Sequence, residues 1–370
     1  MGVRFAALMC LILAACEADA DAWVWDLPDG FPEPFVPADN PMSADKVELG
    51  RHLFYDERLS HNGTMACASC HEQARAFTDG KATTKGSTGH ALPRSAMGLI
   101  NVAYLSIYTW ANPKLATLEE QALVPMFADF PLELGVQLDT AAVLRRFADD
   151  PEYAEMFAAA FPEDDEPVTV ERITQALAAF QRTLISGDSP YDRFAYGGDE
   201  AAISASARRG LDLFFSERTE CYHCHAGVAF SSSFRSASSD PGPPDFQNNG
   251  LYNVDGMGGY PQGNGGLYEF SGDPRDQGKF RVPTLRNVGL TAPYMHDGSI
   301  ATLAGVIEHY AAGGSEVTDG PFAGDGRENP NKSTLVRGLD LDADEKADLV
   351  AFLESLTDEG FVTDPRFAAP

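Results

Sequence analysis

Two copies of a five-residue pattern, C-x-x-C-H, limit what this chain can fold into. The residues that define the two copies are Cys67, Cys70, His71, Cys221, Cys224 and His225. In this pattern both thiols form thioethers with the vinyl groups of a haem, and the adjacent histidine binds its iron. Thiol redox and zinc chemistry also use paired cysteines, but two copies that both end in histidine favour haem. The sequence therefore predicts two covalent c-type haems.

An internal repeat surrounds the two copies. Residues 50–58 match residues 210–218 at Gly, Leu, Phe, Glu and Arg positions, and each stretch precedes one C-x-x-C-H. Each half ends in a stretch with Leu, Phe and Leu at helical spacing, at 177, 180 and 184 and at 349, 352 and 356. Residues 227–279, rich in Gly, Pro, Ser and aromatics, break the helical pattern. We expect an all-α fold of two tandem cytochrome c-like haem domains, residues 41–195 and 196–370, with long irregular loops.

The N-terminus has the pattern of an export signal. Arg4 precedes an apolar run, residues 5–13, and the tetrapeptide Leu-Ala-Ala-Cys ends at Cys16. This tetrapeptide is similar to the lipobox of bacterial lipoproteins, so we interpret residues 1–16 as a lipoprotein signal peptide and Cys16 as the lipid-bearing residue. A plain secretory signal cleaved near Ala20 is the alternative. Residues 17–40 are acidic and rich in Pro and Trp, and we expect them to form an extended tether.

These features predict a periplasmic protein that is attached to a bacterial membrane only through its lipid. No other stretch is long and apolar enough to span a membrane. The formal net charge of −28 argues against nucleic acid and anionic membrane surface as partners, and it favours a basic protein surface. Of the six cysteines, Cys10 lies in the signal, Cys16 would carry lipid and four belong to the haem motifs. None is left for a disulfide.

Two further runs carry a resemblance to a known family. Residues 282–288 read Val-Pro-Thr-Leu-Arg-Asn-Val, and residues 291–298 read Thr-Ala-Pro-Tyr-Met-His-Asp-Gly. With the haem motifs, these runs resemble the bacterial di-haem peroxidases, which include the di-haem cytochrome c peroxidases and MauG. Residues 109–113 and 118–125 resemble its MbnH branch. The resemblance implies that hydrogen peroxide forms a high-valent di-haem state, which oxidises a residue, a tryptophan in the MbnH branch, on a small periplasmic partner protein.

The resemblance also implies roles in the N-terminal domain. His71 corresponds to the proximal ligand of the peroxide-reactive haem, and Gln121 and Glu133 correspond to residues of its distal pocket. A carboxylate there can move the proton that peroxide cleavage requires, and an amide can orient peroxide without titrating. Trp110 corresponds to a tryptophan between the haems. His90 is similar to the histidine that caps the resting iron in cytochrome c peroxidases, but a loop histidine is more often simply exposed, and ligation by His90 stays an open alternative.

In the C-terminal domain the resemblance makes His225 the proximal ligand of a low-spin haem and Tyr310 the second ligand of that iron. Tyr310 stands fourteen residues after His296, where cytochrome c peroxidases have methionine and MauG-like proteins have tyrosine. Methionine raises the potential of the iron, whereas a phenolate is a hard anion that favours higher oxidation states. The alternatives are a di-haem cytochrome c peroxidase that detoxifies hydrogen peroxide with a small cytochrome as electron donor, and a non-enzymatic di-haem electron carrier.

A calcium ion between the haems is also implied, with the carbonyl groups of Thr291 and Pro293 as ligands. The asparagine that supplies a third ligand in the family is missing here, because Arg94 is followed by Ser95. The surface tryptophan of MauG, two residues before the second C-x-x-C-H, is replaced by Thr219. Any electron route to a partner must therefore leave the protein elsewhere.

Overall fold

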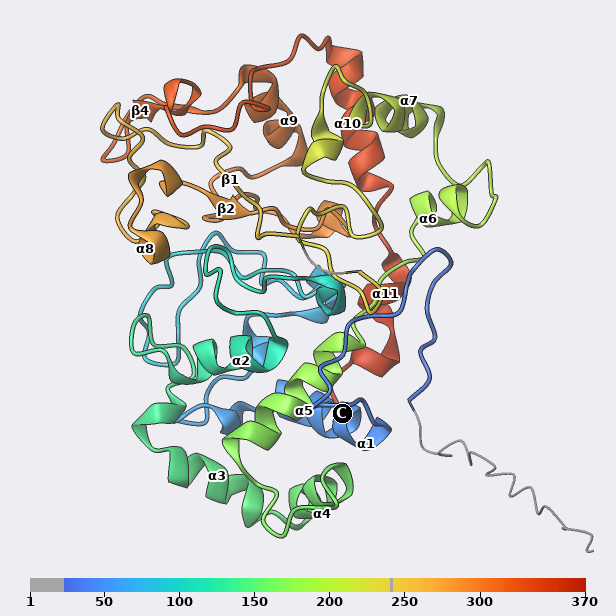
Figure 1. The fold of residues 1–370 in the computed structure, drawn as a ribbon, viewed down its shortest axis with the longest axis vertical. Coiled ribbons are helices and arrows are strands. Elements are labelled where there is room, and N and C mark those ends of the chain that lie inside the picture. The colour runs from blue at the N-terminus through green and yellow to red at the C-terminus, as the bar shows by residue number, and fades with distance from the viewer. Residues whose placement is uncertain (1–22, 240–241) are drawn as a thin grey trace, which may run out of the picture.

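The computed structural model describes residues 23–239 and 242–370, so the predicted signal peptide and Cys16 lie outside the described residues. Within these ranges the chain is rich in helices and its strands are short (Figure 1). The helices of the first half are α1 (Ala44–Tyr55), α2 (Leu118–Phe127), α3 (Thr140–Ala148), α4 (Pro151–Ala160), α5 (Val170–Arg182) and α6 (Pro190–Ala195). The helices of the second half are α7 (Ala205–Phe214), α8 (Tyr268–Ser271), α9 (Leu303–Ala312), α10 (Ala343–Glu354) and α11 (Glu359–Thr363). Two antiparallel pairs of short strands accompany them, β1 (Phe246–Gln247) with β2 (Phe280–Arg281) and β3 (Glu316–Val317) with β4 (Gly324–Asp325).

Polar side chains fix where the helices begin. Ser43 accepts a hydrogen bond from the Lys46 amide at 3.2 Å ahead of α1. Ahead of α2, the Thr117 side chain accepts a bond from the Glu120 amide, and the Glu120 carboxylate accepts one from the Thr117 amide. These contacts satisfy amide groups that the first turn of a helix leaves without partners. The helix that carries Gln121 is therefore fixed at its start.

The internal repeat corresponds to two equivalent helix crossings. Helix α1 packs on α5 at Gly50, where a β-carbon would lie 1.9 Å from the carbonyl oxygen of Ala176. Helix α7 packs on α10 at Gly210, where a β-carbon would lie 1.9 Å from the carbonyl oxygen of Asp348. Neither crossing has room for a side chain, so both require glycine. Because Ala176 and Asp348 occupy equivalent repeat positions, the repeat is a shared mode of helix packing. The domain boundaries stay a prediction.

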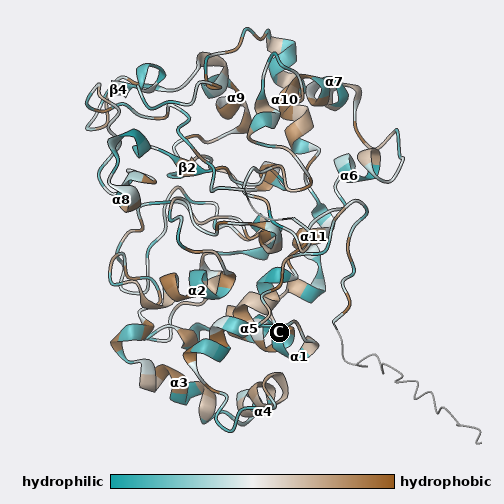
Figure 2. Cartoon of the chain, viewed as in Figure 1, coloured by the Kyte–Doolittle hydropathy of each residue, from teal (hydrophilic) through white to brown (hydrophobic). Residues whose placement is uncertain are grey.

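Each helix pair has a hydrophobic core of its own. In the first half, the ring centroids of Phe54 and Phe180 lie 5.3 Å apart, and in the second half the equivalent rings of Phe214 and Phe352 lie 5.0 Å apart. Figure 2 shows hydrophobic and hydrophilic residues mixed along the helices, as expected for helices with one buried face. Cys67 packs against the first core and Cys221 against the second. Each haem motif is therefore supported by one core.

Both ends of the described chain make contacts that local patterns do not announce. The Phe361 ring in α11 lies 5.7 Å from the Phe77 ring, and the Tyr55 hydroxyl donates a 2.6 Å hydrogen bond to the Phe367 carbonyl oxygen. The last residues therefore return to the first half of the chain. Near the other end Phe31 is buried. Residues 23–40 therefore do not form an entirely free tether. They are attached to the rest of the protein at Phe31, which packs in a hydrophobic cluster.

The segment of residues 227–279 is largely irregular where it is described, as expected. It contains β1 and α8, and its Tyr252 and Tyr260 are buried. The Tyr252 hydroxyl donates a 2.7 Å hydrogen bond to the Asp297 carboxylate, so the segment is fastened to residues 294–298. Among the helices of the described ranges, none has both the length and the apolar character that crossing a membrane requires.

Candidate di-haem site

The first C-x-x-C-H forms a short helical turn after α1, at residues Cys67–Ser69. The Nδ1 atom of His71 lies 2.8 Å from the carbonyl oxygen of Phe77. A carbonyl accepts only from a protonated nitrogen, so this contact keeps the proton on Nδ1 and leaves Nε2 as the metal-binding atom. Burial lowers the pKa of His71, which favours the neutral imidazole that ligation needs. The residues fit a haem-iron ligand.

The second C-x-x-C-H repeats this arrangement at residues Cys221–His223. The Nδ1 atom of His225 lies 3.0 Å from the carbonyl oxygen of Phe230, and burial lowers the pKa of His225. Phe77 and Phe230 both have positive φ, 60° and 47°. In each copy the chain therefore turns back sharply, which brings a carbonyl group to the histidine five or six residues upstream.

The four cysteines of the two motifs are all free thiols. Burial raises the pKa of Cys67 to about 12 and that of Cys70 and Cys224 to about 11. Reactive thiolates normally have a lowered pKa, so these cysteines do not have the setting of a redox pair. Free, neutral thiols beside a metal-ready histidine suit thioether attachment of haem.

Tyr310 shares a cavity with the second motif. The cavity has a volume of about 280 Å³, and its walls include Cys221, Cys224, His225 and Tyr310. Helix α9 supplies the tyrosine, and its N-cap Thr302 accepts a hydrogen bond from the Gly305 amide through its side chain. The histidine and the phenol that the sequence assigned to one iron therefore face one space.

The surroundings of Tyr310 favour the neutral phenol in the absence of a metal. Burial raises its pKa to about 12, while the Asn249 amide acts in the opposite direction. The Asn249 side-chain amide also donates to the sulfur of Met295 at 3.2 Å. A bound ferric iron would have to displace the phenol proton, as metals do with other acidic ligands. An iron bound at Tyr310 would therefore have to ionise the phenol itself.

Trp110 lines the same cavity from the first half of the chain. Its indole nitrogen donates a 3.0 Å hydrogen bond to the Ser95 carbonyl oxygen, and its own carbonyl accepts a 2.8 Å bond from the Arg281 amide. Arg281 is buried, and its guanidinium donates to the Thr109 carbonyl oxygen at 3.1 Å. Desolvation lowers the pKa of Arg281 to about 10. Trp110 is therefore held where residues of both halves meet.

Glu133 lies near the thiols of the first motif. Its negative charge contributes to the raised pKa of both Cys67 and Cys70. Burial raises the pKa of Glu133 itself to about 7. The neighbouring Leu134 amide donates a 2.8 Å hydrogen bond to Pro125 in α2, which ties the Glu133 loop to the helix that carries Gln121. The loop that carries Glu133 and the helix that carries Gln121 are therefore connected by a hydrogen bond.

Gln121 is half-buried in α2, whereas His90 is exposed. The His90 Nδ1 atom lies 2.7 Å from the Thr88 hydroxyl, on a surface loop. The structure therefore places His90 as an exposed loop histidine in this state.

The predicted calcium ligands Thr291 and Pro293 also line the cavity. Ser95, which stands in place of the missing asparagine, donates its amide to the His296 carbonyl oxygen at 2.8 Å and its hydroxyl to the Ala82 carbonyl oxygen at 3.0 Å. The Ser95 side chain is thus already engaged. Calcium binding stays a prediction.

Two polar features were not assigned from the sequence. His296 is buried, and within the described residues its Nε2 atom has no hydrogen-bond partner. Its ring stacks on Phe280 at a centroid distance of 3.8 Å, and burial lowers its pKa to about 4. Arg286 forms a buried, two-pronged ion pair with Asp192 at 2.8 and 2.9 Å. Arg286 lies in residues 282–288 and His296 in residues 291–298, the two runs that resemble the family. The sequence does not show that Arg286 pairs with Asp192 or that His296 is buried.

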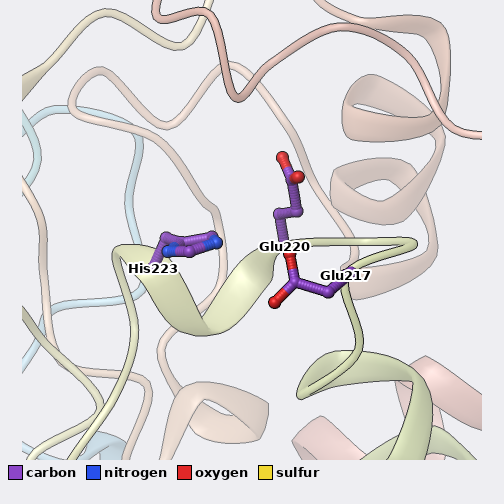
Figure 3. Close-up of side chains that lie close together, drawn as sticks. All are labelled: Glu217, Glu220 and His223. Carbon is purple, nitrogen blue, oxygen red and sulfur yellow. The ribbon is translucent and has the colours of Figure 1, made fainter.

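Beside the second motif, the side chains of Glu217, Glu220 and His223 come close together (Figure 3). One ligand atom of each lies within 4.8 Å of the others. Both carboxylates already have partners, because Glu217 accepts from the Tyr222 hydroxyl and Glu220 accepts from Arg337 at 2.6 Å. We assign no metal to this surface group.

Comparisons with known proteins agree with this geometry. Residues 44–201 match the family model of the di-haem cytochrome c peroxidases. MauG of Methylorubrum extorquens is 33% identical over 93% of this chain and 89% of that protein. The cytochrome-c peroxidase IdrP1 of Denitromonas iodatirespirans is 36% identical over 95% of this chain and 91% of that protein. A crystal structure of a MauG-like protein associated with microbial copper homeostasis is 50% identical, with a TM-score of 0.92 over 94% of this chain and 99% of that chain.

The helical fold and the two cysteine–histidine sites define a c-type di-haem protein. The chain belongs to the family of di-haem cytochrome c peroxidases and MauG, and it is a haem-dependent peroxidase. Membership of this family implies two haems, hydrogen peroxide as oxidant and a protein as partner or electron donor. A non-enzymatic electron carrier does not fit this membership.

Proposed function

We propose that this chain is a di-haem peroxidase of the MauG type that uses hydrogen peroxide to oxidise a tryptophan side chain on a small partner protein. The observation that carries the proposal is Tyr310, which shares a cavity with His225. An anionic oxygen ligand stabilises added positive charge on an iron, whereas a methionine sulfur favours the reduced metal. Similarity at 50% identity to a MauG-like protein supports the same branch.

When bound, the haems would supply peroxide cleavage and storage of the two oxidising equivalents. His71 and His225 would hold the irons through Nε2, because Nδ1 of each is engaged by a backbone carbonyl. The thioethers would form at Cys67, Cys70, Cys221 and Cys224. The protein therefore fixes the position of each haem from the proximal side.

Three further residues have roles in proton transfer, in orienting peroxide and in bridging the two halves of the chain. Glu133 accepts the peroxide proton while ionised and returns it to the departing oxygen. Gln121 orients the bound peroxide through its amide. Trp110, held by Ser95 and the Arg281 backbone, provides the aromatic group between the two halves.

The same proposal includes the wider setting of the enzyme. Residues 41–195 and 196–370 would be tandem cytochrome c-like domains, and Thr291 and Pro293 would contribute to a calcium site between them. The signal pattern supports a periplasmic location with a lipid anchor on Cys16. The partner would be a small periplasmic protein with a basic contact surface, because this chain carries a net charge of −28.

The alternative is detoxification of hydrogen peroxide with a small cytochrome as donor. The 36% identity to IdrP1, which is named a cytochrome-c peroxidase, favours it. The two functions differ in the resting enzyme. We expect a cytochrome c peroxidase with a methionine-type second haem to need one electron before it reacts, and a protein that stores oxidising equivalents to react when fully oxidised.

Stopped-flow mixing of the fully oxidised protein with hydrogen peroxide tests the proposal. We expect an immediate spectral change at both haems that accounts for two oxidising equivalents. Protein treated first with one electron equivalent provides the comparison. If peroxide is consumed only after that reduction, the cytochrome c peroxidase alternative takes the place of the proposal.

A further inference from the structure

A stacked aromatic group lies at the surface of the second haem motif. The rings of Tyr222 and His223 are 4.3 Å apart at 28°, and the rings of Tyr222 and Phe215 are 6.2 Å apart at 27°. His223 is exposed, and Phe215 is 40% exposed. Three aromatic side chains thus extend from the motif to the solvent.

The position of Tyr222 relative to haem follows from the covalent chemistry. Tyr222 stands between Cys221 and Cys224, the two residues that would form the thioethers. A haem attached through both cysteines would therefore have the Tyr222 backbone at its edge. Thr219, the residue at the position of the MauG surface tryptophan, is buried and donates its hydroxyl to the Leu213 carbonyl oxygen. A threonine has no aromatic ring to oxidise, so it offers no route.

Tyr222 also has a proton acceptor in place. Its hydroxyl donates to the Glu217 carboxylate, and this hydrogen bond raises the pKa of the phenol. Removing an electron from a phenol makes its proton strongly acidic, so a carboxylate already in contact lowers the cost of the oxidation. Glu220, three residues further on, is instead paired with Arg337. Figure 3 shows how close the two carboxylates lie to His223.

We propose that Tyr222, with Glu217 as its proton acceptor, is the relay through which oxidising equivalents leave the second haem towards the protein partner. This inference rests on the proposed function, and it names the exit that replaces the missing tryptophan. The contact face would be the exposed edge formed by Phe215, Tyr222 and His223.

The step balances in electrons and protons. Tyr222 gives one electron to the oxidised haem centre and its O–H proton to Glu217, which leaves a neutral tyrosyl radical and a protonated carboxyl. An electron from the partner residue and the proton from Glu217 then restore the phenol. Two such cycles transfer the two electrons that one hydrogen peroxide accepts.

The test uses the haem-loaded full chain as wild type and as Tyr222→Phe and Glu217→Gln variants. The matched controls are Tyr268→Phe, which changes an exposed tyrosine far from the motif in sequence, and Glu220→Gln, which changes the neighbouring carboxylate. Each protein is mixed with hydrogen peroxide and frozen for electron paramagnetic resonance. A parallel sample receives a nitroso spin trap and is mapped by peptide mass spectrometry. A reduced small c-type cytochrome is the donor probe for electron delivery.

We expect wild type and both controls to give a tyrosyl radical and a trap adduct on the peptide that contains Tyr222. Tyr222→Phe should lose both signals and slow electron delivery by about tenfold or more, while the first reaction with peroxide keeps its rate. Glu217→Gln should keep the Tyr222 ring but slow formation of the tyrosyl radical on it. Equal signals and rates in Tyr222→Phe and Tyr268→Phe would overturn the relay alone. A wild type that does not react with peroxide when fully oxidised would overturn the proposed function and the relay with it.

Discussion

The carbonyl oxygen of Phe230 lies 3.0 Å from Nδ1 of His225, and the same contact recurs at 2.8 Å between Phe77 and His71. Each carbonyl accepts the Nδ1 proton, which leaves Nε2 as the atom that would bind an iron. Each phenylalanine reaches this position through a positive φ. The two haem motifs thus share a supporting turn as well as a sequence pattern.

Two such sites predict two covalent haems in each chain. Protein made in a host that attaches c-type haem should give two haems per polypeptide in a pyridine haemochrome assay, and acidic acetone should not extract them. Joint replacement of Cys221 and Cys224 by Ser should leave one covalent haem, because both thioethers of one site are lost. The Cys10→Ser variant, altered outside both motifs, should keep two. A count of one in the wild type contradicts the assignment.

The pKa of Glu133 predicts how the peroxide reaction depends on pH. Burial raises this pKa to about 7, so the carboxyl is protonated below that pH and ionised above it. Only the ionised form accepts the peroxide proton. The second-order rate constant for hydrogen peroxide should therefore rise through about pH 7 and level off above it.

Replacement of Glu133 tests this role directly. Glu133→Gln should remove the rise with pH and slow the reaction by about 10²-fold or more, the usual scale for a lost acid–base group. Resting haem spectra should barely change. Glu155→Gln, which alters an exposed carboxylate on α4, should behave as wild type. Unaltered stopped-flow kinetics for Glu133→Gln would assign the proton transfer to another residue.

Local sequence patterns were sufficient for much of the fold. The repeat predicted that residues around Gly50 and Gly210 have equivalent surroundings, and both glycines meet a backbone carbonyl at the equivalent position. The Ser43 cap was also predictable, because a cap depends on residues three apart. The packing of Phe31 and the return of Phe361 to Phe77 were not. Those contacts join residues far apart in the chain, and no periodic pattern announces them.

The candidate site also contains some residues that could be predicted from the sequence and others that could not. The haem-attachment residues are contiguous, so their chemistry is visible in the sequence. The pairing of Tyr222 with Glu217 was missed, because a five-residue spacing across a turn matches neither helix nor strand periodicity. His296 was noted only as part of a motif. That its Nε2 atom is buried without a partner in the described residues depends on packing.

The glycine at the α7–α10 crossing should be essential to stability. In Gly210→Ala a β-carbon would meet the Asp348 carbonyl oxygen, so the helices must separate. Overpacking of this kind costs about 1–3 kcal/mol of unfolding free energy. Asp212→Ala, on an exposed position of the same helix, should change it by about 0.5 kcal/mol or less. Equal midpoints for both variants in chemical denaturation would show that the crossing adapts.

The lipobox pattern predicts where the protein is found in the cell. If Cys16 carries lipid, the wild type should sediment with membranes and need detergent for release. Cys16→Ser should appear in the soluble periplasmic fraction or stay unprocessed. Cys10→Ser is the control, because it alters a cysteine that would leave with the predicted signal peptide. A wild type that is wholly soluble without detergent would favour a plain secretory signal.

Tyr310 distinguishes the two enzymatic functions. Its phenol lines the cavity of the second motif, and the Asn249 amide opposes the rise in its pKa that burial causes. Tyr310→Met replaces an oxygen ligand that becomes anionic on an iron with a neutral sulfur, so the reduction potential of the second haem should rise. The first haem should still bind hydrogen peroxide, because Glu133 and His71 are unchanged. Sharing of oxidising equivalents between the haems should be lost, and oxidation of the protein partner should fall with it.

Spectroelectrochemical titration measures the potential, and rapid-freeze Mössbauer spectra after peroxide measure the sharing. Tyr310→Phe, which removes the ligand oxygen but keeps the ring, separates loss of ligation from loss of packing. If Tyr310→Met has an unchanged potential and still shares both equivalents, Tyr310 is not the ligand and the proposed function loses its main support.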